Sequence, residues 1–268
     1  MPASAAVSWQ FATGSNLIVP SSFCGGAQSF TYGNCDTWHA TPSAGNPDVD
    51  VRAYANTGTG STIATAYLDV FSGGLGVTNT VENTGPSQTG TSGLYPANQF
   101  HPTVAAPNHA IDNSGNTDSV LLSFQSKVSL TGVLIGWPTA TNQCGAIVCD
   151  TDISVWAYTG AGTPNLLSPG QTYGSLAAGW VMVGNYADVP VGTQTLINSA
   201  PNLDTAGTNT SQYWLISAYY GTSLSTGNDF VKLQAVYGVV PRVSEPESMV
   251  LLLISLLGGA WMRRAKAS

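Results

Sequence analysis

Short stretches in which apolar and polar residues alternate recur along this chain, and Gly, Pro, Asn and Ser residues separate them. In residues 49–56, for example, Val49 and Val51 fall on one face, whereas Asp50 and Arg52 fall on the other. A period of two residues places successive side chains on opposite faces of a β-strand. No segment of useful length before residue 241 has the period of a helix, so the pattern predicts an all-β body.

Further candidate strands share this alternation or a short apolar run; they are 63–71, 120–125, 128–137, 153–158, 179–183, 194–197, 213–220 and 230–240. In the last of them, Val231 and Leu233 oppose Lys232 and Gln234. Residues 79–108 have no periodicity and are expected to form a long loop. Charged residues make up only 8 % of the chain, which favours strands and turns over helices. About eight to ten strands at this spacing predict a jelly-roll-like β-sandwich over residues 7–240.

The charge of this body is strongly negative. All acidic residues except Glu245 and Glu247 precede residue 242, against the three cations Arg52, Lys127 and Lys232, so the formal charge up to residue 241 is −9. Such a charge argues against binding to nucleic acid or to anionic membranes. Binding of cations, or of a neutral polymer such as a polysaccharide, remains compatible with it.

The four cysteines fall in two local pairs, Cys24 with Cys35 and Cys144 with Cys149. An even number of cysteines at local spacing indicates two disulfides in an exported protein. Three pairings are possible, and proximity favours the local one. A zinc site is the alternative, but separations of 11 and 5 residues are not the short gaps of zinc knuckles.

Two short acidic segments offer oxygen ligands that suit Ca²⁺. Asp112, Asn113 and Asp118 precede one predicted strand, and Asp150 and Asp152 precede another. Hard oxygen ligands at close spacing are typical of calcium sites, although no complete EF-hand loop is present. The alternative is that these side chains only cap turns through their own backbone. No other cofactor is expected.

No residue is predicted to be catalytic. His39, His101 and His109 are not arranged in a metal-binding motif, and neither a nucleophile elbow nor a phosphate-binding loop occurs. A triad assembled from distant residues leaves an exported hydrolase as an open alternative. Aromatic pairs offer another kind of site.

Trp156 and Tyr158 share one face of a predicted strand, and Tyr213 and Tyr219 share a face of another. They either form an exposed platform for polysaccharide or belong to a second buried face.

The segment that follows the body has three parts in a fixed order. Ser244-Glu245-Pro246-Glu247 comes first, an uncharged apolar run from Met249 to Met262 follows, and Arg263, Arg264 and Lys266 come last. Fourteen helical residues rise about 21 Å, less than the roughly 30 Å of a bilayer core. The run is therefore marginal as a permanent anchor, and the basic cluster predicts that it ends on the cytoplasmic side. A buried or amphipathic helix is the alternative.

This tail, residues 241–268, resembles the PEP-CTERM protein-sorting signal, which is also described as a C-terminal domain of ice-binding proteins. The family combines a Pro-Glu-Pro element, an apolar helix and an Arg-rich end. Glu245 and Pro246 match the second and third positions of the element, whereas Ser244 replaces the first proline. The resemblance implies processing near Glu245-Pro246 by an exosortase, a membrane-embedded cysteine transpeptidase of Gram-negative bacteria. Arg263 and Arg264 would then act as the stop signal.

Two further features bear on export. Residues 1–6 contain Ala3-Ser4-Ala5, which is similar to a signal-peptide cleavage site; coincidence in an alanine-rich stretch is the alternative. The segment that runs from 109–113 through 135–137 to 150–160 is similar to a recurring body type of exosortase-dependent surface proteins; that resemblance covers residues 95–240 and implies no activity.

The sequence therefore predicts a secreted, non-enzymatic protein that passes transiently through the inner membrane by residues 249–262. It would then reach the cell surface or the extracellular polysaccharide matrix of a biofilm. A carbohydrate-binding or calcium-dependent adhesion module is the alternative for the body. The body lacks regularly spaced Thr-x-Thr ladders, which argues against ice binding.

Overall fold

The computed structural model describes residues 6–12, 17–18, 35–41, 46–81, 88–89, 100–101, 109–140, 142–144, 148–221 and 227–241. Within these residues the chain forms strands and one short 3₁₀ turn, η1 (Tyr173–Ser175). The all-β prediction is confirmed. The finer description as a jelly-roll sandwich stays a prediction.

The strands before residue 110 are β1 (Val7–Gln10), β2 (Leu17–Ile18), β3 (Cys35–Trp38), β4 (Ala40–Thr41), β5 (Val49–Gly58), β6 (Thr62–Thr65), β7 (Tyr67–Phe71), β8 (Gly74–Thr78), β9 (Gln88–Thr89) and β10 (Phe100–His101). Those that follow are β11 (Ile111–Asp112), β12 (Asp118–Trp137), β13 (Ile153–Tyr158), β14 (Trp180–Tyr186), β15 (Gln194–Leu196), β16 (Ser211–Ala218) and β17 (Phe230–Val239).

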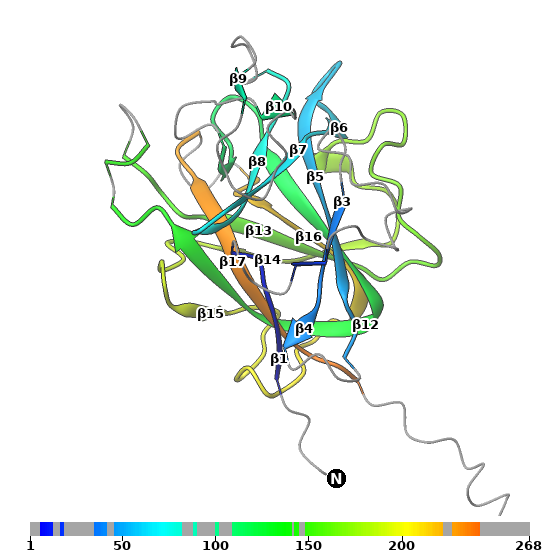
Figure 1. The fold of residues 1–268 in the computed structure, drawn as a ribbon. Helices are drawn as coiled ribbons and strands as arrows, with labels where there is room; N and C mark the ends of the chain where they lie inside the picture. Colours follow the sequence, from blue (N-terminus) through cyan, green and yellow to red (C-terminus); the bar gives the residue numbers. More distant parts are fainter. Residues whose placement is uncertain are drawn as a thin grey trace, which may run out of the picture.

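The 20-residue strand β12 connects the two parts of the main sheet. Its first half pairs with β5 and β16, and its second half pairs with β17 and β15. The register shifts between Ser123 and Val128, where Gln125, Ser126 and Lys127 are exposed. Figure 1 shows β12 as a long curved strand. The sequence predicts two strands joined by a turn here, and the structure corrects this to one bent strand.

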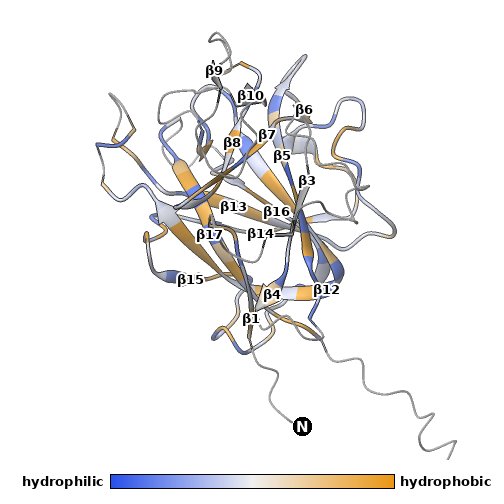
Figure 2. Cartoon of the chain, viewed as in Figure 1, coloured by the Kyte–Doolittle hydropathy of each residue, from blue (hydrophilic) through white to orange (hydrophobic). Residues whose placement is uncertain are grey.

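The named strand pairs of the main sheet are all antiparallel, and its strands follow the order β14-β13-β16-β12-β17-β1-β4. Strand β5 lies off this path and pairs with the first half of β12. Both halves of β12 contribute to one buried cluster, which also takes residues from β1, β5, β13, β16 and β17. Trp9 and Phe124 meet edge to face in it, with ring centroids 4.7 Å apart. Hydrophobic residues are concentrated along these strands in Figure 2, as burial of apolar surface requires.

A second buried cluster covers the opposite face of β12, β13 and β16. Trp156 is 4 % exposed and packs there with Leu121, Leu215 and Tyr173. The hydroxyls of Tyr173 and Ser119 are hydrogen bonded at 2.7 Å. The sequence left the face of Trp156 open between a platform and a core, and the structure places Trp156 in a core.

Strand β17 departs from the predicted alternation, because Lys232 is only 5 % exposed. Its Nζ lies 3.7 Å from the centroid of the Phe71 ring and 5.0 Å from that of Trp137. The aromatic rings of β7 and β12 therefore provide a partner for a cation that the sequence places on an outer face.

The Cys144–Cys149 disulfide is confirmed, with a Cα–Cα distance of 5.4 Å. Cys24, and with it the Cys24–Cys35 pairing, lies outside the described residues. So do residues 1–5 and residues 242–268, which include Ser244, Glu245, Pro246, the apolar run with its expected helix, Arg263 and Arg264. In the part of the chain that the structure describes, no helix is long and apolar enough to cross a membrane.

Candidate ligand groove and acidic cluster

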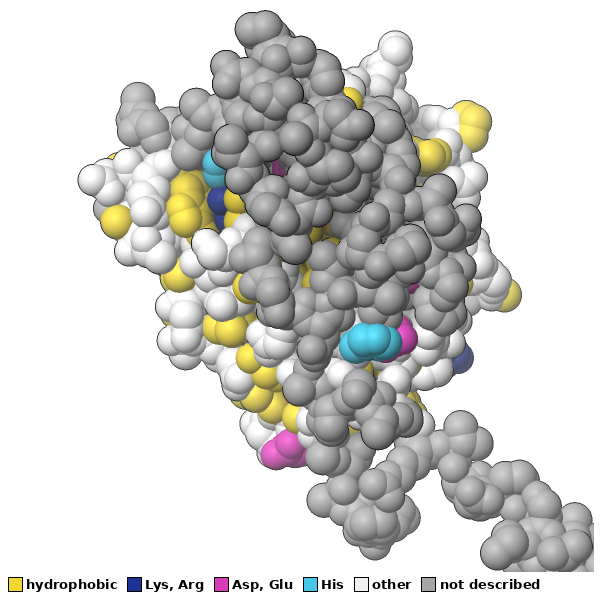
Figure 3. All heavy atoms as spheres, in the orientation of Figure 1, with side chains coloured by type: hydrophobic (Ala, Val, Ile, Leu, Met, Phe, Trp, Pro, Cys, Tyr) yellow, Lys and Arg dark blue, Asp and Glu magenta, His cyan; other side chains and the backbone are white. Residues whose placement is uncertain are grey.

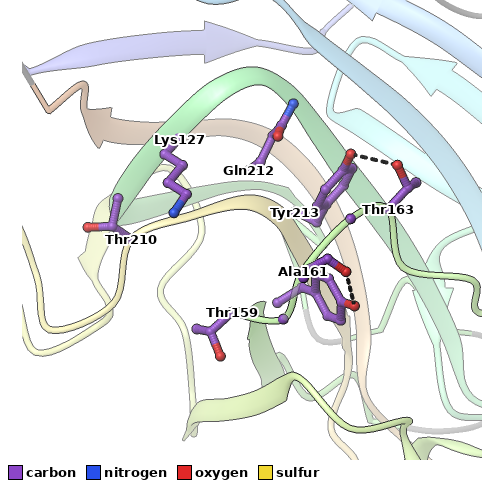
Figure 4. A pocket seen from close by; sticks show the side chains of 10 residues that line it. Lys127, Thr159, Ala161, Thr163, Thr210, Gln212 and Tyr213 are labelled. Carbon is purple, nitrogen blue, oxygen red and sulfur yellow. Dashed lines mark hydrogen bonds between the residues drawn. The ribbon is translucent and has the colours of Figure 1, made fainter. Parts of the chain in front are cut away.

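Two tyrosines meet where β13 ends and β16 begins. Tyr158 and Tyr213 are paired in the antiparallel register of these strands, and their ring centroids lie 6.1 Å apart at 73°. Both side chains are half-buried. Figure 4 shows side chains that line the hollow at this point, Tyr213 among them.

Hydrogen bonds of the hydroxyl groups hold both rings in place. The Tyr158 hydroxyl donates to the carbonyl oxygen of Ala161 at 3.1 Å. The Tyr213 hydroxyl is hydrogen bonded to Oγ1 of Thr163 at 3.2 Å. The Trp180 ring supports Tyr158 from β14, with centroids 5.3 Å apart. The rings are therefore fixed before any ligand arrives, which lowers the entropic cost of binding.

Glycines make room for the Tyr158 ring. A Cβ on Gly179 would lie 2.7 Å from Cε2 of Tyr158, and one on Gly160 would lie 2.7 Å from Cζ. Gly179 also has φ of +105°, a conformation that other residues rarely adopt. The sequence around the hollow is thus matched to a ring in this position.

The lining of the hollow is polar and almost uncharged. It has a volume of about 530 Å³, and the residues around it are Lys127, Tyr158, Thr159, Gly160, Ala161, Gly162, Thr163, Thr210, Gln212 and Tyr213. An adjoining hollow of about 540 Å³ shares Gln212 and Tyr213 and adds Asp50, Ser123, Phe124 and Gln125. We call the two together the tyrosine groove. Its charged lining residues are Lys127 and Asp50, whose charges balance.

The tyrosine groove has few groups that could perform chemistry. Asp50 is the single carboxylate of its lining, which contains neither histidine nor cysteine. Glycoside hydrolysis, by comparison, uses a pair of carboxyl groups on opposite sides of the bond. What the groove offers is ring surface for stacking with threonine and glutamine side chains for hydrogen bonding.

A separate acidic cluster lies at the other end of β13. One carboxylate oxygen each of Asp150, Asp152 and Asp188 lies within 4.8 Å of the others. The Asp188 amide donates to Oδ1 of Asp152 at 2.7 Å, and the Thr151 amide donates to Oδ1 of Asp150 at 2.8 Å. Asp188 has φ of +49°. Burial, with Asp150 and Asp188 nearby, raises the pKa of Asp152.

Asp229 lies beside this cluster and is completely buried. The Phe230 amide donates to the Asp150 carbonyl at 2.9 Å, and the Asp150 amide donates to the Asn228 carbonyl at 2.8 Å. Burial, together with the charges of Asp152 and Asp150, raises the pKa of Asp229 to about 7. No Lys or Arg is among the groups that shift the pKa of Asp152 or Asp229.

The predicted calcium ligands around residue 112 are directed to different partners. Oδ1 of Asp112 accepts from the Ser114 amide at 2.9 Å, and Oδ1 of Asp118 accepts from Nδ2 of Asn79 at 3.1 Å. Asn113 donates its amide to Oδ2 of Asp229 and accepts from the Asp229 backbone amide at 3.0 Å. The Ser114 contact of Asp112 is turn capping, whereas Asp118 and Asn113 bond to residues distant in sequence; the geometry therefore lends no support to a calcium site at Asp112, Asn113 and Asp118.

The histidines have separate roles. Nδ1 of His39 lies 2.8 Å from Oδ1 of Asp48, and the ring is exposed. The His109 ring packs on Phe71 with centroids 4.6 Å apart. Burial and the charge of Lys232 lower the pKa of His109. The side chain of His101 lies outside what the structure describes.

On the face in Figure 3, charged side chains are sparse among the coloured atoms.

The sequence indicated some of these residues but not their arrangement. It singled out Asp150, Asp152, Tyr158 and Tyr213, whereas Asp188 and Asp229 carried no local signal. Tyr219, predicted to share a face with Tyr213, is 3 % exposed and lies outside the groove lining.

No protein-family description matches the chain, and no curated protein matches it. Among solved structures, a chain of the β-galactosidase BgaA of Streptococcus pneumoniae matches with 13 % identity and a TM-score of 0.29. The match covers 71 % of this chain and 92 % of the other. A likeness this distant carries no argument about activity. The class that the strands define is an antiparallel all-β protein.

Proposed function

We propose that this protein is a non-enzymatic, exported module that binds a neutral polysaccharide in the tyrosine groove. The observation that carries the proposal is the pair of fixed tyrosine rings in a polar lining with balanced charge. Sugar rings present apolar C–H faces to aromatic rings and hydroxyl groups to polar side chains. A lining of threonine and glutamine provides hydrogen bonds for those hydroxyls.

The shape of the groove favours a chain over a small molecule. Its two hollows, of about 530 and 540 Å³, adjoin at Gln212 and Tyr213. Each is within the range of ordinary ligand sites. Two such hollows in succession suit consecutive units of a polymer. The negative charge of the body disfavours a polyanion.

Binding of the full-length protein to neutral polysaccharides tests this proposal. Pull-down or isothermal titration should show that Tyr213→Ala weakens binding at least tenfold, equivalent to about 1.4 kcal/mol. Gln212→Ala should weaken it less, because it removes hydrogen bonds and leaves the rings. Tyr237→Ala, a half-buried tyrosine on β17 outside the groove, is the matched control.

Thermal unfolding of each variant separates loss of binding from loss of fold. If the wild-type protein binds none of a broad set of neutral polysaccharides, the proposed function is wrong. Equal weakening by Tyr237→Ala would place the binding elsewhere.

We further propose that the protein reaches the cell surface through an exosortase of a Gram-negative bacterium. The support is the order of Ser244-Glu245-Pro246, the apolar run 249–262 and the basic residues Arg263 and Arg264. In this proposal the apolar run holds the chain in the inner membrane until it is processed. The acidic body then works in the extracellular polysaccharide.

A further inference from the structure

We propose that Asp150, Asp152 and Asp188 bind a Ca²⁺ ion beside the buried carboxyl of Asp229. This inference is independent of the polysaccharide-binding proposal. Strand β13, Ile153–Tyr158, separates the cluster from the tyrosine groove. Six residues of strand correspond to roughly 20 Å.

The first support is the supply of oxygen atoms at one point. The three carboxylates lie within 4.8 Å of one another, although Asp188 is far from the other two in sequence. The backbone amides occupy Oδ1 of Asp150 and Oδ1 of Asp152. These amide contacts fix the orientation of both carboxyl groups at the cluster. Carboxylate oxygens in this number are the usual ligands of Ca²⁺.

The second and independent support is Asp229. Its side chain is 0 % exposed, and its Oδ1 has no hydrogen-bond partner among the described residues. The Asp152 backbone amide faces the same carboxyl, which directs Asp229 toward the cluster. Buried carboxyl oxygens are nearly always satisfied by a partner. A cation held by the neighbouring aspartates would provide one.

The backbone keeps Asp229 in this position without the ion. The Asp150 carbonyl accepts from the Phe230 amide, and the Asp152 carbonyl accepts from the Tyr219 amide at 3.1 Å. Asn113 holds Oδ2 of Asp229. The Asp229 carboxyl is therefore held in the interior beside the cluster.

The surroundings favour Ca²⁺ over Mg²⁺. Asp188 is exposed at the rim of the cluster, whereas Asp152 is buried, so water can complete an irregular coordination shell. Ca²⁺ accepts six to eight ligands in flexible geometry, whereas Mg²⁺ requires a near-ideal octahedron. Exposed modules outside the cell typically bind Ca²⁺ with dissociation constants of about 10⁻⁴–10⁻³ M.

Calorimetric titration of the chelator-treated, full-length protein with CaCl₂ tests the site. We expect one equivalent of Ca²⁺ to bind, and saturating Ca²⁺ to raise the Tm by about 5 °C relative to EDTA. Mg²⁺ at the same concentration should raise the Tm less. No heat of binding up to 10 mM Ca²⁺, a concentration well above that range, would refute the proposal.

The Asp188→Asn variant distinguishes carboxyl groups that bind a Ca²⁺ ion from carboxyl groups that stay close because they share protons. Asn tolerates the positive φ of this position, so the fold should persist. We expect the variant to lose the Ca²⁺ response and to have an unchanged or higher Tm in EDTA, because one repelling charge is gone. The exposed Asp204→Asn is the control and should respond like the wild type. A full Ca²⁺ response in Asp188→Asn would overturn the assignment.

Polysaccharide binding provides a separate readout. Asp188→Asn should bind polysaccharide like the wild type in EDTA, because the tyrosine groove lies at the other end of β13. Failure of the calcium site would thus leave the function of the groove standing, and the converse also holds.

Discussion

Lys232 holds its ammonium group against aromatic rings in the interior of the protein. The Nζ atom lies over Phe71 at 3.7 Å, and burial lowers the pKa of the side chain to about 8. The charge of Asp69 acts in the opposite direction and raises this pKa. His109 packs on the same Phe71 ring. Burial of the charged form is therefore the larger effect, and it costs stability below pH 8.

This pKa leads to a prediction for the pH dependence of stability. A pKa that is lower in the folded than in the unfolded protein means that the unfolded chain binds more protons, so stability rises with pH. Between pH 8 and 9.5 we expect the free energy of unfolding to increase by about 1.5 kcal/mol from Lys232 alone. Lys232→Met should lack this increase and be at least as stable at pH 7.

Urea unfolding of both proteins at several pH values measures the difference. The two curves should keep a constant separation below about pH 7.5 and approach each other as the pH rises from 8 to 9.5, between the folded and the unfolded pKa of Lys232. A separation that stays constant between pH 8 and 9.5 would show that Lys232 is not the group responsible.

At the residue scale, the sequence predicts which side chains share a face but not what covers that face. Trp156 and Tyr158 alternate in the same way on β13, yet Trp156 is buried against Leu166 and Tyr173, whereas Tyr158 lines the groove. The difference depends on how the chain after β13 folds back, and no local pattern encodes that. Asp188 likewise joins Asp152 only through the tertiary fold.

At the scale of elements, the hairpin of β7 and β8 packs closely on β17. Gly74 begins β8 with φ of +116°, and a Cβ there would lie 2.3 Å from the Leu233 carbonyl oxygen. Both the conformation and the backbone contact require glycine. The sequence predicted a break at Gly73-Gly74, and the structure shows that it is a tight hairpin between Phe71 and Gly74.

Gly74→Ala should therefore destabilise the protein by about 3 kcal/mol or more, because φ strain adds to displacement of β17. Gly115→Ala is the matched control: its φ is +84°, and nothing lies within 4 Å of the added Cβ. It should cost only about 1–2 kcal/mol. Denaturant unfolding compares the two variants. Equal losses in the free energy of unfolding would mean that β17 moves away from the added Cβ at no cost in stability.

Strand β12 illustrates what the sequence cannot define for an element. The polar residues 125–127 resemble a turn between two alternating segments, but they form an exposed bend in a continuous strand. The two halves pair with different neighbours, and the core-facing phase continues through the bend and changes only between Leu130 and Val133, where the register with β17 shifts. Those neighbours are distant in sequence, so alternation predicts both halves and misses their continuity.

At the scale of the whole molecule, pairing between distant strands determines where a ligand can bind. The tyrosine groove exists because β13 and β16 align Tyr158 with Tyr213. The acidic cluster exists because residues 150–152 lie beside Asp188 and the start of β17. Alternation predicted the all-β class, since that depends on each strand separately. Long-range register was needed for both sites.

The tail provides the last prediction, which concerns the destination of the molecule. Deletion of Glu245 and Pro246 removes the two residues that match the sorting element while leaving the apolar run intact. We expect the body of this mutant to remain in the inner-membrane fraction of the producing cell, because an unprocessed run followed by Arg263 and Arg264 resists passage through the bilayer. Ser244→Pro, which completes Pro-Glu-Pro, should be processed at least as well as the wild type. Intact mass of the protein from culture supernatant would locate the cleavage site, and release of the deletion mutant at wild-type levels would rule out this sorting route.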